Sequence, residues 1–375
     1  MRRATGESFN ISKVLSGDMS IRDLANDVHE RIEAGYVIKG AARSEEVPLF
    51  TMHPISQTSV ALGTGPAWPN KISNPLIFVM SSPRSGSTLF QLILNTHPDC
   101  YAPQELFLLM VNTVGEWRQW FLGMVFAEPL FASIKELMGT TITDAHNFFT
   151  TLPNDMHMRD LYQLLQEMCS PKILADKTPM NCAHPRFLLQ AVNGWEDPTF
   201  IFLCRHPTAA IQSIMDVGKN IGLVQGLRNY ASDVEQLENA EQTWINSNRN
   251  VLDVLPHTVP GSKYMTILYE QLVADPEPTL QRVCKMLHFA WEPQMLKPYD
   301  TESATKFKEA ATVLVGDPLL FTRSLIDSRQ ADKWKHVTLP APLRSATIAL
   351  VYRAIQTSQR PLLTRILLDI SLTGT

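Results

Sequence analysis

The sequence is poor in features that mark several large classes of protein. Five cysteines occur among 375 residues without a CxxC pair, which argues against a disulfide framework and against a zinc site. No run reaches the roughly 18 apolar residues that span a bilayer, and no apolar stretch follows the basic start MRRATGESFN. A net charge of -4 provides no overall basic field for nucleic acid or an anionic membrane. We expect a cytoplasmic protein without nucleic-acid or membrane partners.

What the sequence does contain is an alternation of short apolar runs and helical patterns. PLIFVMSS, KILAD, TFIFLCRHP and KYMTILYEQL suit buried strands, whereas TLFQLILNTHP, RFLLQAVNG, TAAIQSIMDVG and EPTLQRVCKMLHF suit helices. This order predicts an α/β fold with a doubly wound parallel sheet flanked by helices. Ligands of such sheets bind beyond the carboxyl ends of the strands. The loops that follow the strands are therefore the place to search for chemistry.

The composition divides the chain into three regions. Residues 1–70 contain one predicted helix, in SIRDLANDVHERIEAG, and a linker rich in Pro, Gly, Ser and Thr. Residues 71–340 form the α/β domain, in which 111–168 is mainly helical. Residues 341–375 form a tail of one or two amphipathic helices, which pack either on the core or against a partner such as a second subunit.

The stretch IFVMSSPRSGSTLFQLIL, residues 77–94, has the pattern of a P-loop-like anion site. The backbone N–H groups and the dipole of a helix start attract an anion, and Gly86 permits close approach. Arg84 adds a planar, permanently charged fork suited to phosphate or sulfate oxygens. Further hydroxyl donors are Ser85, Ser87 and Thr88. The ATP-binding consensus GxxxxGK[ST] fails because Ser81 replaces its first glycine and Ser87 its lysine.

A second basic position follows the third predicted strand. In CRHPTAAIQS, Arg205 ends the strand and Ser213 lies eight residues later, about two turns along the next helix, where it can share the same face. The two residues either clamp a second phosphate or are an ordinary strand-terminal arginine and helical serine.

Together, PRSGST and RHPTAAIQS resemble the two cofactor signatures of the PAPS-dependent sulfotransferases. PAPS is 3′-phosphoadenosine 5′-phosphosulfate, and PAP is its desulfated product. The resemblance spans about residues 75–337 and is strongest to the sulfotransferase domains of modular polyketide synthases of the curacin and olefin-synthase type, through LADKTP, PQMLKPY and ADKWK among others. The tyrosylprotein sulfotransferases share the layout more remotely.

The resemblance implies PAPS as cofactor, without a metal. The first signature would hold the 5′-phosphosulfate and the second the 3′-phosphate, while Tyr269 would touch the nucleotide. The loop SRQADKWK would close over the 3′-phosphate and adenine, with Trp334 against the base. The cofactor-binding residues implied in this way are Arg84, Ser85, Gly86, Ser87, Thr88, Arg205, Ser213, Tyr269, Arg329, Lys333, Trp334 and Lys335.

The resemblance also suggests which residues carry the chemistry, together with Arg84. Cytosolic sulfotransferases use a histidine in a KTHLP-like segment, but the comparable DKTPM has Pro179 in that place. Glu105, which lies at the spacing of the tyrosylprotein branch, is the predicted general base, and its apolar neighbours would raise its pKa; otherwise it is a solvent-facing carboxylate. Lys177 would stabilise the departing phosphate, and Asp176 would either orient Lys177 or form a plain ion pair.

The resulting prediction is a sulfotransferase that acts by in-line displacement on a hydroxyl of a small, apolar acceptor, such as a polyketide, an acyl chain or another secondary metabolite. Region 111–168 would supply the acceptor wall and lid. The acceptor is either a free small molecule or bound to a carrier protein, and the absence of adjoining carrier segments favours a free-standing enzyme. A homodimer is compatible with the C-terminal helices. A P-loop kinase-like phosphotransferase and a non-catalytic nucleotide-binding module are the alternatives.

Overall fold

The computed structural model describes residues 71–123, 125–225, 230, 232–300 and 324–358. Apart from the last residues of helix α9, these belong to one compact unit. The helix and linker predicted in residues 1–70, and the end of the predicted C-terminal tail, lie outside the described residues.

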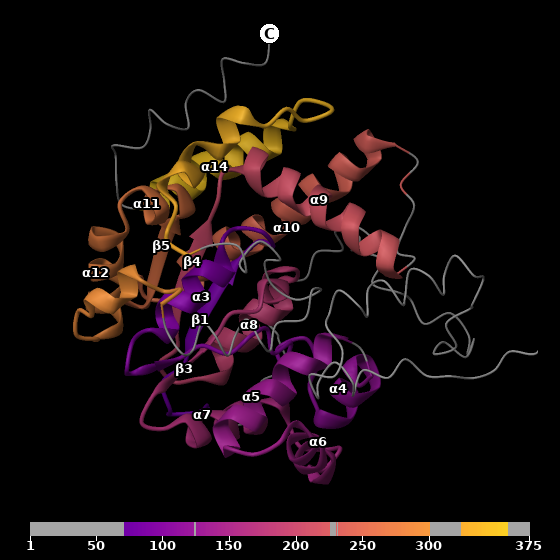
Figure 1. Cartoon of the computed structure of the whole chain (residues 1–375), viewed down its shortest axis with the longest axis vertical. Helices are drawn as coiled ribbons and strands as arrows, with labels where there is room; N and C mark the ends of the chain where they lie inside the picture. The colour runs from indigo at the N-terminus through magenta and orange to yellow at the C-terminus, as the bar shows by residue number, and fades with distance from the viewer. Residues whose placement is uncertain (1–70, 124, 226–229, 231, 301–323, 359–375) are drawn as a thin grey trace, which may run out of the picture. The chain divides into compact units, whose positions relative to one another are not determined.

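A five-stranded sheet forms the centre of this unit, in the order β2-β3-β1-β4-β5. All neighbouring strands are parallel, which confirms the predicted sheet (Figure 1). The strands are β1 Ile77–Ser81, β2 Cys100–Tyr101, β3 Ile173–Asp176, β4 Thr199–Cys204 and β5 Tyr264–Leu268. The sequence analysis missed β2, and it extended the last strand too far because helix α11 already begins at Tyr269.

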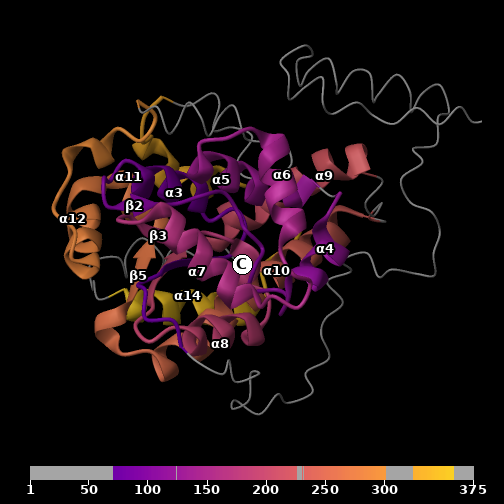
Figure 2. The ribbon, with the colours of Figure 1, turned by 90° about the horizontal axis from the view of Figure 1, so that it is seen from below.

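Helices cover both faces of the sheet because both faces are apolar. Ile77 and Val79 of β1 point to one face, and the alternate residues Phe78 and Met80 point to the other. The first face is covered by α3 Ser87–Asn95, α11 Tyr269–Ala274 and α12 Pro276–Leu287. The second is covered by α7 Met158–Cys169, α8 Pro185–Gly194, α10 Asp233–Thr258 and α14 Ser345–Thr357. Figure 2 shows α3 and α11 on one side of the strands and α8 and α14 on the other.

Region 111–168 is helical, as predicted. It consists of α4 Val114–Phe121, the 3₁₀ turn η1 Val125–Ala127, α5 Glu128–Met138, α6 Ile142–Thr151 and α7. Helices α4, α5 and α6 gather at one end of the ribbon in Figure 1. Trp117, Phe131 and Phe149 pack edge to face at their centre, where all three are fully buried. Its role as acceptor wall and lid stays a prediction.

The remaining elements complete the connections between strands and helices. They are α9 Pro207–Gln225 and the 3₁₀ segments η2 Pro179–Cys182, η3 Gly261–Lys263, η4 Pro293–Leu296 and η6 Ser328–His336. In the tail region, Leu350 and Val351 of α14 are buried in the core, and Arg344 forms an ion pair with Glu241 of α10 at 2.9 Å. This part of the tail therefore packs on the domain. Across the described ranges, no helix has the length and apolar character needed to cross a membrane.

Candidate active site

The loop between β1 and α3 has the form of an anion cradle. Arg84 and Gly86 both have positive φ angles, of 64° and 87°. Gly86 is the residue before the first turn of α3, and no side chain caps that turn, so its N–H groups keep the capacity to bind an anion. Ser82 Oγ and Ser85 Oγ lie 2.7 Å apart and tie the loop to itself. The remaining predicted donors, Ser87 and Thr88, are buried in the first turn of α3.

Both residues of the second predicted phosphate site contact this loop. Arg205 Nη1 donates to the carbonyl oxygen of Arg84 at 2.9 Å, and Arg84 Nε donates to Ser213 Oγ at 3.1 Å. The structure thus brings together Arg84, Arg205 and Ser213 from segments more than a hundred residues apart. Arg205 Nε is buried and has no hydrogen-bond partner among the described residues. A buried, unpaired donor on a permanent cation fits an anionic ligand such as a nucleotide phosphate.

The ring of Tyr269 packs against the loop between β1 and α3 and against Arg205. Its side chain is only 2% exposed, and the guanidinium of Arg205 lies over its ring, 4.5 Å from the centroid. A β-carbon on Gly86 would lie 2.3 Å from the same ring. Tyr269 is thus a buried platform for Arg205 and for the loop, and its contact with the nucleotide stays a prediction.

Replacing Gly86 by alanine is expected to lower the free energy of unfolding by about 2–4 kcal/mol, because the positive φ strains alanine and the ring of Tyr269 must move. Gly123→Ala is the matched control: Gly123 has a φ of +85°, and a β-carbon added there would meet no atom within 4 Å. Chemical denaturation of both variants separates backbone strain from the clash. Equal losses in the two variants would contradict the proposed contact with Tyr269.

Glu105 and Lys177 form a close pair at the other side of β1. Lys177 follows β3 and donates from Nζ to Glu105 Oε1 at 3.0 Å. The lysine side chain is 1% exposed and the glutamate side chain 15% exposed. A lysine so deeply buried requires a partner for its charge. Glu105 therefore faces Lys177 and is not the solvent-facing carboxylate of the alternative interpretation.

Asp176 and Lys177 form neither a hydrogen bond nor an ion pair with each other, although the sequence analysis expected Asp176 either to orient Lys177 or to form an ion pair with it. The buried carboxylate of Asp176 accepts hydrogen bonds from Tyr162 Oη at 2.5 Å, Thr178 Oγ1 at 2.7 Å and Asn181 Nδ2 at 2.9 Å. Burial raises the pKa of Asp176, while these three bonds and the charge of Lys177 act in the opposite direction. Tyr162 and Asn181 were missed because each carries an ordinary polar side chain outside the quoted motifs, and Thr178, although it lies within LADKTP, was given no role.

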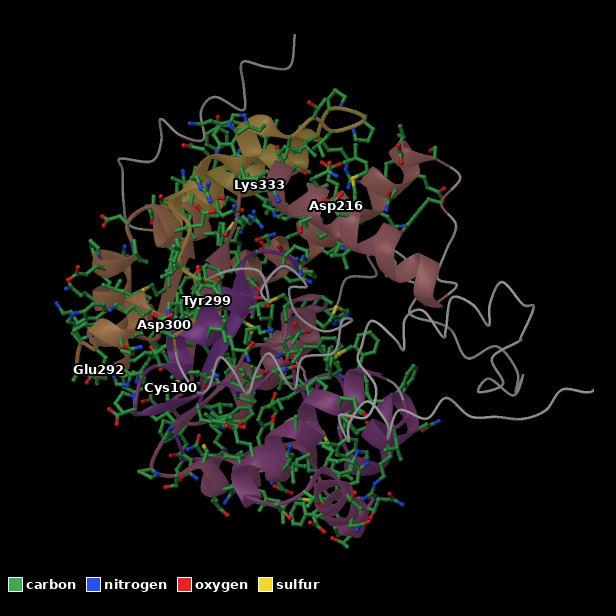
Figure 3. All side chains as sticks on the ribbon, in the orientation of Figure 1. Cys100, Asp216, Glu292, Tyr299, Asp300 and Lys333 are labelled. Atoms are coloured by element: carbon green, nitrogen blue, oxygen red, sulfur yellow. The ribbon has the colours of Figure 1, made fainter. Side chains whose placement is uncertain are left out.

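The late basic loop forms η6, which packs on α11. In Figure 3, Lys333 of this loop and Asp216 of α9 lie in the upper part of the ribbon, and Cys100, the first residue of β2, lies below them. The loop lies at the carboxyl ends of the strands, because α11 directly follows β5 and Trp334 of η6 stacks on His206, two residues after the end of β4. Arg329 and Lys335 form ion pairs with acidic neighbours, Asp327 and Asp332, and their contact with the cofactor stays a prediction.

Trp334 is the residue of η6 that reaches the second phosphate site. Its ring stacks on the ring of His206 with centroids 4.2 Å apart and planes at 14°. Burial, and secondly the charge of Arg205, lower the pKa of His206 to about 3, so the imidazole is neutral at neutral pH. The backbone N–H of His206 donates to the buried carboxylate of Glu270 at 3.0 Å, which fixes the turn after β4.

Taken together, fold and site define a P-loop-like α/β protein with a P-loop-like turn after its central strand and a basic residue after each flanking strand. Residues 75–293, more than half of the chain, match the model of the sulfotransferase family. The chain belongs to this family, and the resemblance in its sequence is confirmed.

Two solved structures agree closely with the chain. It is 30% identical to the sulfotransferase domain of the Synechococcus PCC 7002 olefin synthase, with a TM-score of 0.68, over 80% of this chain and 99% of that domain. It is 32% identical to the sulfotransferase domain from the curacin biosynthetic pathway, with a TM-score of 0.67, over 76% of this chain and 98% of that domain. These are relatives of the type that the sequence resemblance indicated.

A curated relative belongs to the tyrosine-modifying branch. The chain is 21% identical over 225 residues to a protein-tyrosine sulfotransferase of Drosophila melanogaster, which covers 59% of this chain. The match spans only 40% of the length of the fly protein. The similarity thus covers less than half of the fly protein, and nothing about the acceptor of this chain follows from it.

Proposed function

We propose that this protein transfers a sulfuryl group from PAPS to a hydroxyl of a small, apolar acceptor by in-line displacement. The observation that carries the proposal is the order of three adjacent strands. The loop of Arg84 follows the central strand β1, Lys177 follows β3 on one side, and Arg205 follows β4 on the other. Carboxyl ends of neighbouring parallel strands meet at one edge of the sheet. The nucleotide would be held by the loop and Arg205, with its reacting group toward Lys177.

Glu105 and Lys177 have different tasks in this proposed reaction. PAPS supplies the sulfuryl group. Glu105 takes the proton from the acceptor hydroxyl, a task that typically contributes about 10²–10⁴-fold. Lys177 stabilises negative charge on the leaving oxygen from a buried, water-poor position. Arg84 and the helix start of α3 orient the group in line. The proposed reaction uses no metal.

The apolar nature of the acceptor is supported by the residues that follow Glu105 in the chain. The ring of Phe107 packs against Phe121 and Phe126, with centroids 5.6 Å and 5.5 Å away. Phe121 and Phe131 are fully buried and serve as core, Met138 is exposed, and Met124 lies outside the described residues. The proposed acceptor wall is therefore limited to the partly buried Phe126 and Phe148. We propose a polyketide, acyl or related metabolite, either free or bound to a carrier protein.

Calorimetry with PAP tests the cofactor. We expect PAP to bind without Mg²⁺, and Arg205→Met to weaken binding about 10–100-fold, because a buried charge-assisted donor contributes roughly 1.5–3 kcal/mol. Arg186→Met, at an exposed arginine in the first turn of α8, is the control and should bind normally. Binding of Mg-ATP in preference to PAP would instead favour the kinase-like alternative.

Transfer itself is tested with ³⁵S-labelled PAPS and a panel of hydroxylated lipids, phenols and carrier-bound β-hydroxyacyl chains. We expect label on an apolar hydroxyl compound. PAP binding without any transfer or hydrolysis of PAPS would favour a non-catalytic nucleotide-binding module. If only a carrier-bound substrate becomes labelled, the acceptor is carrier-bound and not a free small molecule.

A further inference from the structure

The turn after β3 holds the segment of Glu105 at two points. Lys177 Nζ donates to Glu105 Oε1 at 3.0 Å, and the backbone N–H of Leu106 donates to Thr178 Oγ1 at the same distance. Leu106 and Thr178 are both 0% exposed. The first contact fixes the side chain of Glu105, and the second fixes the backbone that carries it.

The hydroxyl of Thr178 has its direction set by Asp176. A hydroxyl has one proton, and Thr178 gives it to Asp176 Oδ1 at 2.7 Å, so a lone pair faces the N–H of Leu106. The second oxygen of Asp176 accepts from Tyr162 and Asn181 and is held in place by them. Both carboxylate oxygens of Asp176 therefore accept hydrogen bonds, and this buried network favours a single orientation of the Thr178 hydroxyl.

The segment of Glu105 needs such an anchor. Phe107, two residues further on, has a φ of 56°, in the left-handed region that a bulky residue adopts only under constraint from its surroundings. Without the hydroxyl, the buried N–H of Leu106 would lose the partner that the structure gives it. Movement of this backbone would carry the carboxylate of Glu105 away from Lys177.

We propose that Thr178 is a positioning residue for the transfer reaction: through Leu106 it holds the Glu105 carboxylate in line with Lys177, and Asp176 sets the orientation of its hydroxyl. The inference rests on the proposed function, in which Glu105 is the base. It assigns a kinetic role to the residue that follows Lys177 in the chain. A role limited to stability would leave turnover of the folded enzyme unchanged.

The decisive comparison is between Thr178→Val, which keeps the shape but removes the acceptor, and Thr178→Ser, which keeps the hydroxyl. For Thr178→Val we expect kcat to fall about 10–100-fold, because a displacement near 1 Å is costly to an aligned reaction. The affinity for PAP and the KM for PAPS should stay unchanged, since neither Thr178 nor Leu106 belongs to the nucleotide loop. Thr178→Ser should recover most of the activity.

Asp176→Asn is the second variant, in case Thr178→Val does not fold. An asparagine that donates to Thr178 Oγ1 would leave the hydroxyl proton facing Leu106, and kcat should fall in the same way. Equal kcat in wild type, Thr178→Val and Asp176→Asn would overturn the inference, as would a serine variant as slow as the valine variant. The wild-type enzyme tests the proposed function separately. If it neither binds PAP nor transfers the sulfuryl group, the proposed function and this inference both fail. If it does both, and kcat is unchanged in the variants, only this inference fails.

Discussion

Changing Glu105 to glutamine is expected to lower kcat by about 10²–10⁴-fold, the usual contribution of a general base. Glutamine keeps the size of the side chain, and its carbonyl oxygen can still accept from Lys177. It loses the negative charge and the basicity that remove a proton from the acceptor. The affinity for PAP should hold, because the proposed nucleotide contacts lie on the loop of Arg84 and on Arg205, which contact each other and not Glu105. Calorimetry with PAP and single-turnover transfer of ³⁵S measure the two quantities on the same preparation.

The control for this experiment is Glu167→Gln. Glu167 is exposed on α7, and within the described part of the chain its side chain bonds to that of Gln163, at 2.9 Å. The Glu167→Gln variant should have the kcat of the wild type. If Glu105→Gln keeps full turnover, the proton leaves by another route and the base must be sought elsewhere. The neutral imidazole of His206 is poorly placed for that role because its ring is covered by Trp334.

Most of the fold could be predicted from the sequence because its strands are short, apolar and bounded by turn residues. Burial on both faces of β1 and β4 produces unbroken apolar runs that no amphipathic helix would show. The two-residue strand β2 carries too little pattern to be recognised. Tyr269 was assigned to a strand because it directly follows the largely apolar run YMTIL, and no capping residue marks the start of helix α11 at Tyr269.

The candidate site could be predicted in part, for reasons that differ between its residues. Arg84, Arg205 and Ser213 lie in local motifs, so their types and spacing were visible in the sequence. Their contact with one another depends on the pairing of β1 with β4, which no local pattern contains. Trp334 was expected against the adenine base, yet in the structure its ring stacks on His206. Whether it contacts a bound base stays a prediction.

The side-chain partners of Asp176 and Lys177 could not be predicted from the sequence. An acidic residue directly before a lysine suggests an ion pair, but neighbouring residues at the end of a strand point to opposite faces. Asp176 therefore turns toward Tyr162 of α7, and Lys177 turns toward Glu105. The sequence separation of 72 residues between Lys177 and Glu105 hides this pairing from any local pattern.

Changing Lys177 to methionine is expected to lower kcat by about 10²–10³-fold, the cost of removing one preorganised stabiliser of developing charge. Methionine keeps the unbranched apolar stem but removes the ammonium group. Nucleotide affinity should change far less than turnover, because the charge acts mainly on the leaving oxygen as the bond breaks. Lys263→Met is the control: its ion pair with Asp197, at 2.6 Å, is partly exposed and lies before β5, at the amino end of the sheet.

Combining Glu105→Gln with Lys177→Met tests whether the two residues act as a unit. Each single change removes one charge of the same buried ion pair, so the double variant should lose much less than the product of the two single losses. Independent tasks would instead give multiplied losses, because the base would still work without the lysine. Since the structure joins the two groups at 3.0 Å with the lysine 1% exposed, we expect strong coupling. Rate constants for the four proteins at saturating PAPS, with PAP affinity measured in each, decide between a catalytic unit and two independent residues.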